Sequence, residues 1–177
     1  MASTQRGSAS QKSTVLLIGS TGNIGRYLTT ELQHHSDSVK IRYVSRHEQQ
    51  VQQWREEGRD AVFLDLDIPS SFPYALVNVD RVFLLTTYTV SMLTQSKTLI
   101  DAAKKAGVSH IVHLGIFADW DTTVPHYTWH QLIECYIKAS GISWTLLHPN
   151  MYYDNLLTPK LIAGTTFLVK FGTHRAG

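Results

Sequence analysis

Residues 14–25 read TVLLIGSTGNIG, and this stretch decides the fold. Thr14–Ile18 is an apolar, β-branched run of the kind that forms a buried strand. Gly19 lets the chain turn off that strand, Gly22 lets the backbone approach a pyrophosphate, and Gly25 lets the next helix pack closely on the sheet. A helix that begins here points free N–H groups and its positive end at the phosphates. The residues expected to contact a dinucleotide are Gly19, Thr21, Gly22, Asn23, Ile24 and Gly25.

The rest of the chain alternates strand-like and helix-like segments. Further strands are predicted at 39–44, 61–64, 80–85, 109–114 and 143–147, and helices at 23–34, 48–58, 91–106 and 127–139. This alternation predicts an α/β fold with a doubly wound parallel sheet, Rossmann-like, in three αβα layers. Leu132 and Trp144 are expected to lie in the core. Residues 1–13 carry almost no large apolar side chains and are expected to form a flexible tail.

Length, composition and charge exclude several classes of protein. The chain has 177 residues, of which 43% are hydrophobic, so it can bury a core. A formal net charge of +2 argues against nucleic acid or an anionic membrane as the main partner. No apolar run approaches the roughly 18 residues of a membrane span. The single cysteine, Cys135, excludes an internal disulfide and favours a reducing, cytoplasmic location.

The end of the second predicted strand indicates which dinucleotide is bound. An NAD site normally has Asp or Glu about 20 residues beyond the glycine loop, where the acid holds the ribose 2′-hydroxyl. This chain has Ser45 and Arg46 there, and no acid before Glu48. A guanidinium would pair with a 2′-phosphate, so NADP(H) is favoured over NAD(H). The alternative is a solvated arginine at a strand exit with no ligand.

The next two strand ends are expected to face the same ligand. Asp65 and Leu66 end the third strand, beside the adenine, and Thr86 and Thr87 end the fourth, near the nicotinamide ribose. Ligands of such sheets bind at the carboxyl ends of the strands, so these positions follow from topology. Each could equally be an ordinary strand-end turn.

The usual catalytic residues of short-chain dehydrogenases are missing. The fifth strand ends in Gly115 where these enzymes have Ser, and Tyr127 is followed four residues later by Gln131 and not by Lys. Tyr127 remains a candidate catalytic residue even without the lysine. His126, His130 and Glu134 share one helix face, but the full metalloprotease motif is absent, and no metal site is predicted.

Residues 126–157 carry a more specific resemblance. The Ile-Glu helix, the Ser-Gly-Ile turn after Ala139, the strand Trp-Thr-Leu-Leu, the His-Pro pair and the segment Tyr152–Leu157 resemble the NmrA-like family of atypical short-chain dehydrogenases. Family reductases often carry a Lys eleven residues before the Gly of that turn, and here this position holds His130. The resemblance therefore implies that His130 donates to a carbonyl or ring nitrogen beside the nicotinamide. It also implies that Tyr152, Tyr153 and Asn155 line the substrate side.

The resemblance implies an organisation and two main functions. Residues 14–150 would be the NAD(P)-binding domain, and 151–177 the start of a truncated substrate-side region, because relatives continue for roughly another hundred residues. The first function is an NADPH-dependent reductase of a small flat substrate, such as a quinone, enone or imine, in secondary metabolism or xenobiotic reduction. The alternatives are a non-catalytic NADP(H)-sensing regulator that binds a protein partner, and a truncated inactive paralogue.

Overall fold

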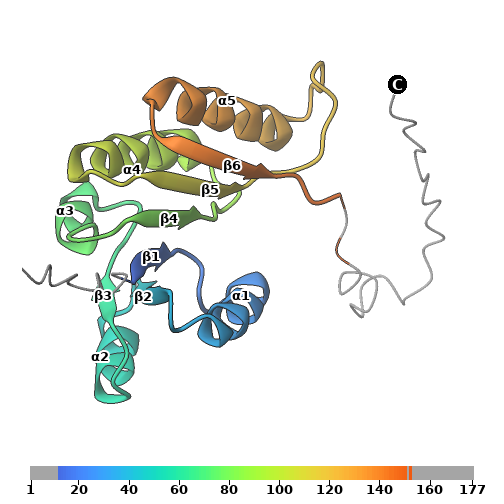
Figure 1. The fold of residues 1–177 in the computed structure, drawn as a ribbon. Helices are drawn as coiled ribbons and strands as arrows, with labels where there is room; N and C mark the ends of the chain where they lie inside the picture. Colours follow the sequence, from blue (N-terminus) through green and yellow to red (C-terminus); the bar gives the residue numbers. More distant parts are fainter. Residues whose placement is uncertain (1–11, 151, 153–177) are drawn as a thin grey trace, which may run out of the picture.

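A computed structural model describes residues 12–150 and residue 152 (Figure 1). Within this part, six parallel strands form one sheet in the order β3-β2-β1-β4-β5-β6. The strands are β1 (Ser13–Leu17), β2 (Val39–Ser45), β3 (Ala61–Phe63), β4 (Arg81–Leu84), β5 (His110–Leu114) and β6 (Ser143–Leu147). The helices are α1 (Asn23–His34), α2 (Glu48–Glu56), α3 (Phe72–Ala75), α4 (Met92–Ala106) and α5 (Pro125–Ser140), with a 3₁₀ turn η1 (Pro69–Ser71) before α3.

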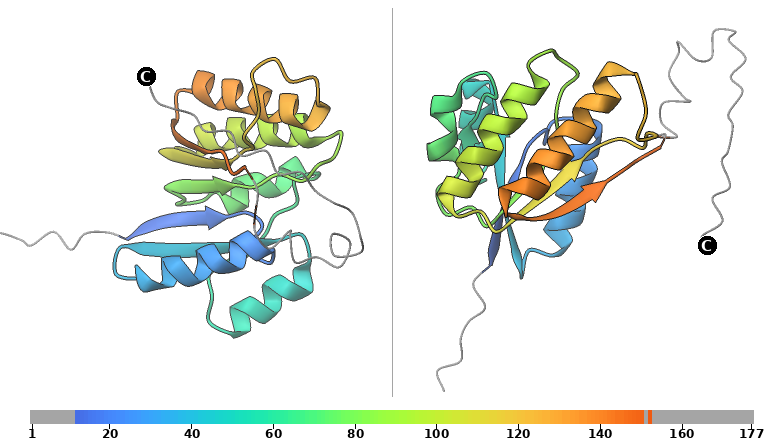
Figure 2. Two further views of the ribbon diagram at one scale, coloured as in Figure 1. Left: turned by 90° about the vertical axis from the view of Figure 1, so that its right-hand side faces the viewer. Right: turned by 90° about the horizontal axis from the view of Figure 1, so that it is seen from above.

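Helices cover both faces of the sheet, and neighbouring residues of β2 show the division. Tyr43 packs against Trp54 of α2, with ring centroids 5.5 Å apart, and its hydroxyl lies within hydrogen-bond distance of Gln33 on α1. Val44 points to the opposite face and joins the core beneath α3, α4 and α5. Figure 2 shows α3, α4 and α5 side by side on one side of the sheet and α1 on the other. The predicted doubly wound, three-layer fold is confirmed.

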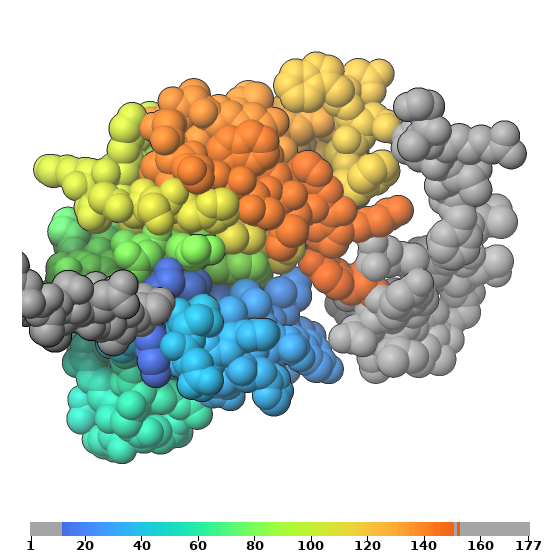
Figure 3. Space-filling model, in the orientation of Figure 1, coloured from blue at the N-terminus to red at the C-terminus, as the bar shows by residue number. Residues whose placement is uncertain are grey.

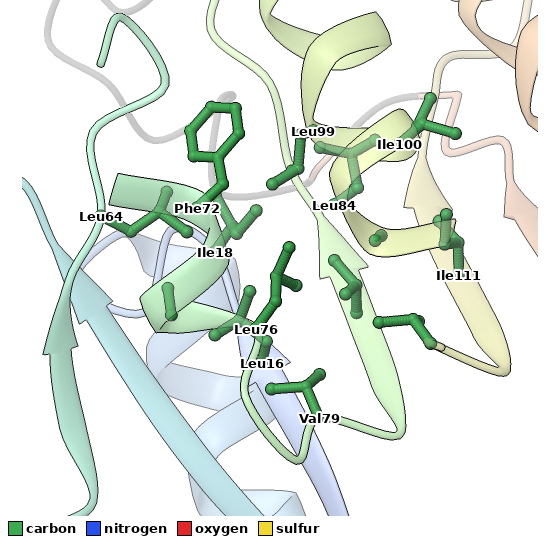
Figure 4. Packing of buried hydrophobic residues seen from close by; sticks show 14 of the residues in the cluster. Leu16, Ile18, Leu64, Phe72, Leu76, Val79, Leu84, Leu99, Ile100 and Ile111 are labelled. Carbon is green, nitrogen blue, oxygen red and sulfur yellow. The ribbon is translucent and has the colours of Figure 1, made fainter. Parts of the chain in front are cut away.

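The larger core lies between the sheet and the α3–α5 layer (Figure 4). Phe72 and Leu76 fill the space above Leu16 and Leu84, and all four side chains are almost fully buried. Each such side chain contributes about 1.5–3 kcal/mol of burial free energy. This packing fixes the central strands, so the loops that leave β1 and β4 stand on a rigid base.

The strand order places a switch point between β1 and β4. Chain connections from β1 run toward β2 and β3, whereas those from β4 run toward β5 and β6. Leu17 of β1 aligns with Phe83 of β4, so the two strands end together. Such a point opens a crevice at the carboxyl edge, where ligands of this architecture bind. In the space-filling view, α5 and β6 form one end of the molecule and α2 the other (Figure 3).

Three local expectations differ from the structure. β1 begins at Ser13, which the sequence analysis assigned to the flexible tail. Leu132 is 50% exposed because it lies on the flank of α5, beside the buried residue Ile133. Trp144 is 44% exposed because β6 is the last strand of the sheet in the part of the chain that the structure describes, and the ammonium group of Lys138 stands over its indole ring. The short helix α3 was not anticipated.

Candidate functional site: a cleft at the carboxyl edge of the sheet

The glycine loop holds α1 against the end of β1. Gly19 has a φ of +80°, a conformation that favours glycine. A Cβ on Gly25 would lie 2.1 Å from the carbonyl oxygen of Gly19, so only glycine fits there. The Gly22 amide donates to the same Gly19 carbonyl over 3.0 Å. The loop is therefore closed on its own backbone, with no room for side chains between it and the helix.

The first turn of α1 fits a phosphate group. The residue before the helix is Gly22, which supplies no side-chain cap, and the first turn contains no acidic residue. The N–H groups of a first helical turn have no partner within the helix, and here no capping side chain covers them. The local charge is positive, because the helix dipole is joined by the Arg26 guanidinium, which donates to the Asn23 side-chain oxygen over 2.7 Å. These features suit the pyrophosphate that the sequence predicts at this position.

A cavity of about 340 Å³ extends from the loop across the ends of β1, β2 and β3. It brings together residues from five separate segments: Gly19, Thr21, Ser45, Arg46, Asp65, Leu66, Thr87 and Gln95. All of these except Gln95 were expected from the sequence. The carboxyl ends of parallel strands thus gather the predicted cofactor residues along one groove.

Arg46 and Ser45 stand at the outer end of this groove. Arg46 is exposed, and no ion pair found among the described residues includes it. The Ser45 hydroxyl oxygen accepts a hydrogen bond from the His47 amide over 3.1 Å, which leaves its own proton free to donate. A guanidinium and a hydroxyl donor side by side can hold a phosphate monoester.

Gln95 is a groove residue that sequence reasoning missed. Its side-chain amide donates to Asp67 over 2.6 Å, and Asp65 accepts from the Asp67 amide over 3.0 Å. The amide oxygen of Gln95 is buried and has no partner in the described part of the chain. A buried carbonyl oxygen without a donor is costly unless a ligand satisfies it. Gln95 lies one turn inside α4, so no local motif marked it.

A second cavity, of about 360 Å³, adjoins the first at Leu85. Its lining is largely apolar or aromatic and comprises Ile24, Leu85, Thr86, Tyr88, Leu114, Gly115, Ile116, His130, Pro149, Asn150 and Tyr152. The Thr86 hydroxyl is buried without a partner among the described residues. The cavity size and composition are those of a small-molecule site. It lies at the end of the groove where topology places the nicotinamide.

Two buried histidines meet behind this cavity. The His113 Nε2 atom lies 3.1 Å from His130 Nδ1, and His113 Nδ1 lies 3.3 Å from the Leu84 carbonyl oxygen. His113 is fully buried and His130 is 3% exposed. The pKa of both rings is lowered to about 4, mainly by burial. A smaller lowering comes from neighbouring histidines: His130 acts on His113, and His126 and His148 act on His130. Both imidazoles are therefore neutral at pH 7.

Glu134 fills the place of the missing serine. A Cβ at Gly115 would lie 2.6 Å from the Glu134 Oε1 atom. That same oxygen is 2.7 Å from the Nε2 atom of His148, which follows β6. The glycine at the end of β5 is thus explained by packing, since the carboxylate of α5 and its histidine partner occupy the adjoining space.

The other predicted residues fall in three groups. His130, Ile24, Thr86 and Tyr152 line the second cavity, as a shared site requires. Tyr127 is not among its lining residues and instead packs edge-on against His126, with ring centroids 4.5 Å apart. Tyr153 and Asn155 lie outside the described residues. Tyr88, which the sequence places with Thr86 and Thr87 at the end of the fourth strand, also lines this cavity. Sequence reasoning did not identify His113 as part of the site, because it lies on a strand without a recognisable motif.

Two further findings concern metals and membranes. Within residues 12–150 and 152, no group of three or more His, Cys, Asp or Glu side chains could hold a metal ion. None of the helices described is both long and apolar enough to cross a bilayer. Cys135 is a free, exposed thiol on α5.

The strand order, the glycine loop and the groove define a Rossmann-type dinucleotide-binding domain. More specifically, the chain belongs to the NmrA-like family, whose sequence model matches residues 11–170. This confirms the family resemblance inferred from residues 126–157.

Curated relatives and solved structures agree with this assignment. The chain is 31% identical to an NAD(P)H azoreductase of Xenophilus azovorans over 81% of its own length and 50% of that protein's. It is 25% identical to quinone oxidoreductase 2 of Escherichia coli K12, again over 81% and 50%. The chain thus spans about half the length of these relatives.

Two solved structures show the same fold. That of the E. coli quinone oxidoreductase complexed with NADPH has a TM-score of 0.70 at 25% identity, over 81% of this chain and 50% of that one. That of the Citrobacter sp. triphenylmethane reductase complexed with NADP(H) has a TM-score of 0.73 at 22% identity, over 86% and 54%. At the latter identity the likeness concerns the fold alone.

Proposed function

We propose that the chain binds NADP(H) in the groove and presents its nicotinamide to the adjoining cavity, as part of a reductase of small flat molecules. The observation that carries the proposal is the meeting of the two cavities at Leu85, beside the glycine loop. One cavity is polar at its rim and suits a dinucleotide. The other is apolar and suits an aromatic substrate.

Each part of the cofactor has residues that would hold it. The pyrophosphate would lie on the N-terminus of α1, and the 2′-phosphate would pair with Arg46 and Ser45. The adenine would lie against Leu66, with its amino group donating to Asp65 or to the unsatisfied oxygen of Gln95. The Thr86 hydroxyl would form a hydrogen bond with the nicotinamide end of the cofactor.

NADPH, when bound, supplies the hydride. The chain itself supplies position and surroundings: Tyr88, Leu114 and Tyr152 would flank a flat ring. The described residues offer no Tyr–Lys pair at this place, so solvent water is the proposed source of the one proton that completes the reduction after hydride transfer. Quinones, enones and imines are the proposed substrates, and the names of the azoreductase and quinone oxidoreductase relatives support this class.

The test is the consumption of NADPH by the purified 177-residue chain. Loss of nicotinamide absorbance with at least one quinone, enone or imine would support the reductase. Stable binding of NADPH with no consumption across the panel would exclude it and favour an NADP(H)-sensing regulator, which the glycine at the serine position also fits. The comparison variant is Gly25→Ala, which should reduce consumption by weakening NADPH binding at the loop.

A further inference from the structure

The hydrogen-bond chain behind the second cavity fixes the proton on each histidine. A carbonyl oxygen only accepts, so the His113 Nδ1 atom, 3.3 Å from Leu84, must carry the proton. A neutral imidazole has one proton, so His113 Nε2 is then a bare acceptor. The His130 Nδ1 atom, 3.1 Å away, must therefore donate to it. The proton of neutral His130 is thus held on Nδ1.

The other nitrogen of His130 follows from this count. Its Nε2 atom carries no proton, and no residue that the structure describes forms a hydrogen bond to it. His130 also lines the second cavity. We infer that His130 presents a hydrogen-bond acceptor, not a donor, to the cavity, and that the site recognises flat molecules carrying an O–H or N–H group. This deepens the proposed function and reverses the donor role that the family resemblance implied for His130.

The surroundings of His130 keep this arrangement. The Tyr88 ring stands edge-on to it at 83°, with centroids 6.0 Å apart, and the His126 ring also packs edge-on against Tyr88, with centroids 5.0 Å apart. Burial holds the pKa of both His113 and His130 near 4, so neither ring gains a second proton at pH 7. His113 is accordingly a positioning residue: it acts on the ligand only through the tautomer of His130.

The ligands that fit are phenols, hydroquinones and aromatic amines. A bare quinone offers only acceptors to His130, whereas its reduced form offers an O–H donor. The same holds for an imine and its amine. The cavity would therefore hold the reduced or hydroxylated form of a substrate more tightly than a form of the same shape without a donor.

The tautomers can be read directly by long-range proton–nitrogen correlation NMR at pH 7 on the whole chain. We expect His113 and His130 both to be protonated at Nδ1. In the His113→Phe variant His130 loses its acceptor and should shift toward the Nε2-protonated form, whereas His126→Phe should leave it unchanged. Protonation of wild-type His130 at Nε2 would overturn the inference, and this reading needs neither cofactor nor turnover.

Ligand recognition is tested with a matched pair, 2-naphthol and 2-methoxynaphthalene, titrated in the presence of NADP⁺ so that no hydride is available. One hydrogen bond corresponds to a preference of about fivefold for 2-naphthol. In His130→Phe this preference should fall to nearly onefold, while His126→Phe should retain it. Equal affinity for the two compounds, or no binding of either, would overturn the recognition step. NADPH binding measured on the same protein preparations without NADP⁺ reports separately on the proposed function.

Discussion

Lowering the pH from 7 to 5 should destabilise the fold through the buried pair His113 and His130. Burial is the main reason that both pKa values lie near 4, compared with 6.5 for a free histidine. Below pH 6.5 the two histidines bind protons in the unfolded chain, whereas in the folded chain they stay neutral until about pH 4. The stabilisation from the neutral rings is therefore complete above pH 6.5 and is lost as the pH falls toward 4.

The magnitude follows from the proton count. Once the histidine is protonated in the unfolded chain, each ring lowers the free energy of unfolding by about 1.4 kcal/mol per pH unit. Between pH 7 and pH 5 this amounts to nearly 2 kcal/mol for each ring, and about 3–4 kcal/mol for the pair. That is a large fraction of the roughly 5–15 kcal/mol by which domains are stable.

The assay is urea unfolding at pH 7, 6 and 5, followed by tryptophan fluorescence. The double variant His113→Phe/His130→Leu removes both titrating rings and keeps the site apolar. Between pH 7 and pH 5 it should lose about 3 kcal/mol less stability than the wild type. His34→Gln, an exposed position on α1, should behave as wild type. If the wild type and the double variant lose the same stability between pH 7 and pH 5, the reasoning is refuted.

Two further predictions concern the loop and the sheet edge. Gly25→Ala should destabilise the fold by about 3 kcal/mol and weaken NADPH binding at least about tenfold, because the alanine Cβ would overlap the Gly19 carbonyl oxygen. Unchanged NADPH binding in a fluorescence titration would contradict the tight packing of the loop. Asp60→Asn should cost about 1–3 kcal/mol at pH 7, since it leaves the half-buried Arg42 without its carboxylate. Burial alone would raise the pKa of Asp60, but hydrogen bonds from Arg42 and Lys40 lower it below 3.8. In urea unfolding, the difference in stability between the wild type and Asp60→Asn should therefore shrink as the pH falls below about 4. A stability difference that stays constant with pH would argue against the ion pair.

The sequence was sufficient for the elements and the loop because their signals are local. Helix α1 and strand β6 have the predicted bounds, 23–34 and 143–147, since glycines and short turns limit both. Helix α3 escaped prediction because four residues are too short to show a periodicity. The exposure of Trp144 follows from the place of β6 at the end of the described sheet, and no local pattern indicates the order of the strands.

The cofactor groove was predictable for the same reason that the fold was. Parallel strands bring their carboxyl ends together, so residues such as Ser45 and Asp65 could be assigned to one site from strand ends alone. The histidine pair could not be found this way. His113 lies on β5 and His130 on α5, and their contact depends on how that helix crosses the sheet.

The groove is proposed to bind NADP(H) with Arg46 on the 2′-phosphate. This binding mode is tested most directly by the dissociation constants of NADPH and NADH for the wild type, Arg46→Ala and the control Arg59→Ala, whose side chain pairs with Glu57 outside the groove. The wild type should prefer NADPH at least about tenfold, and Arg46→Ala should lose this preference by weakening NADPH binding alone. Equal affinity of the wild type for both dinucleotides, or an equal loss for both in Arg46→Ala, would contradict this binding mode.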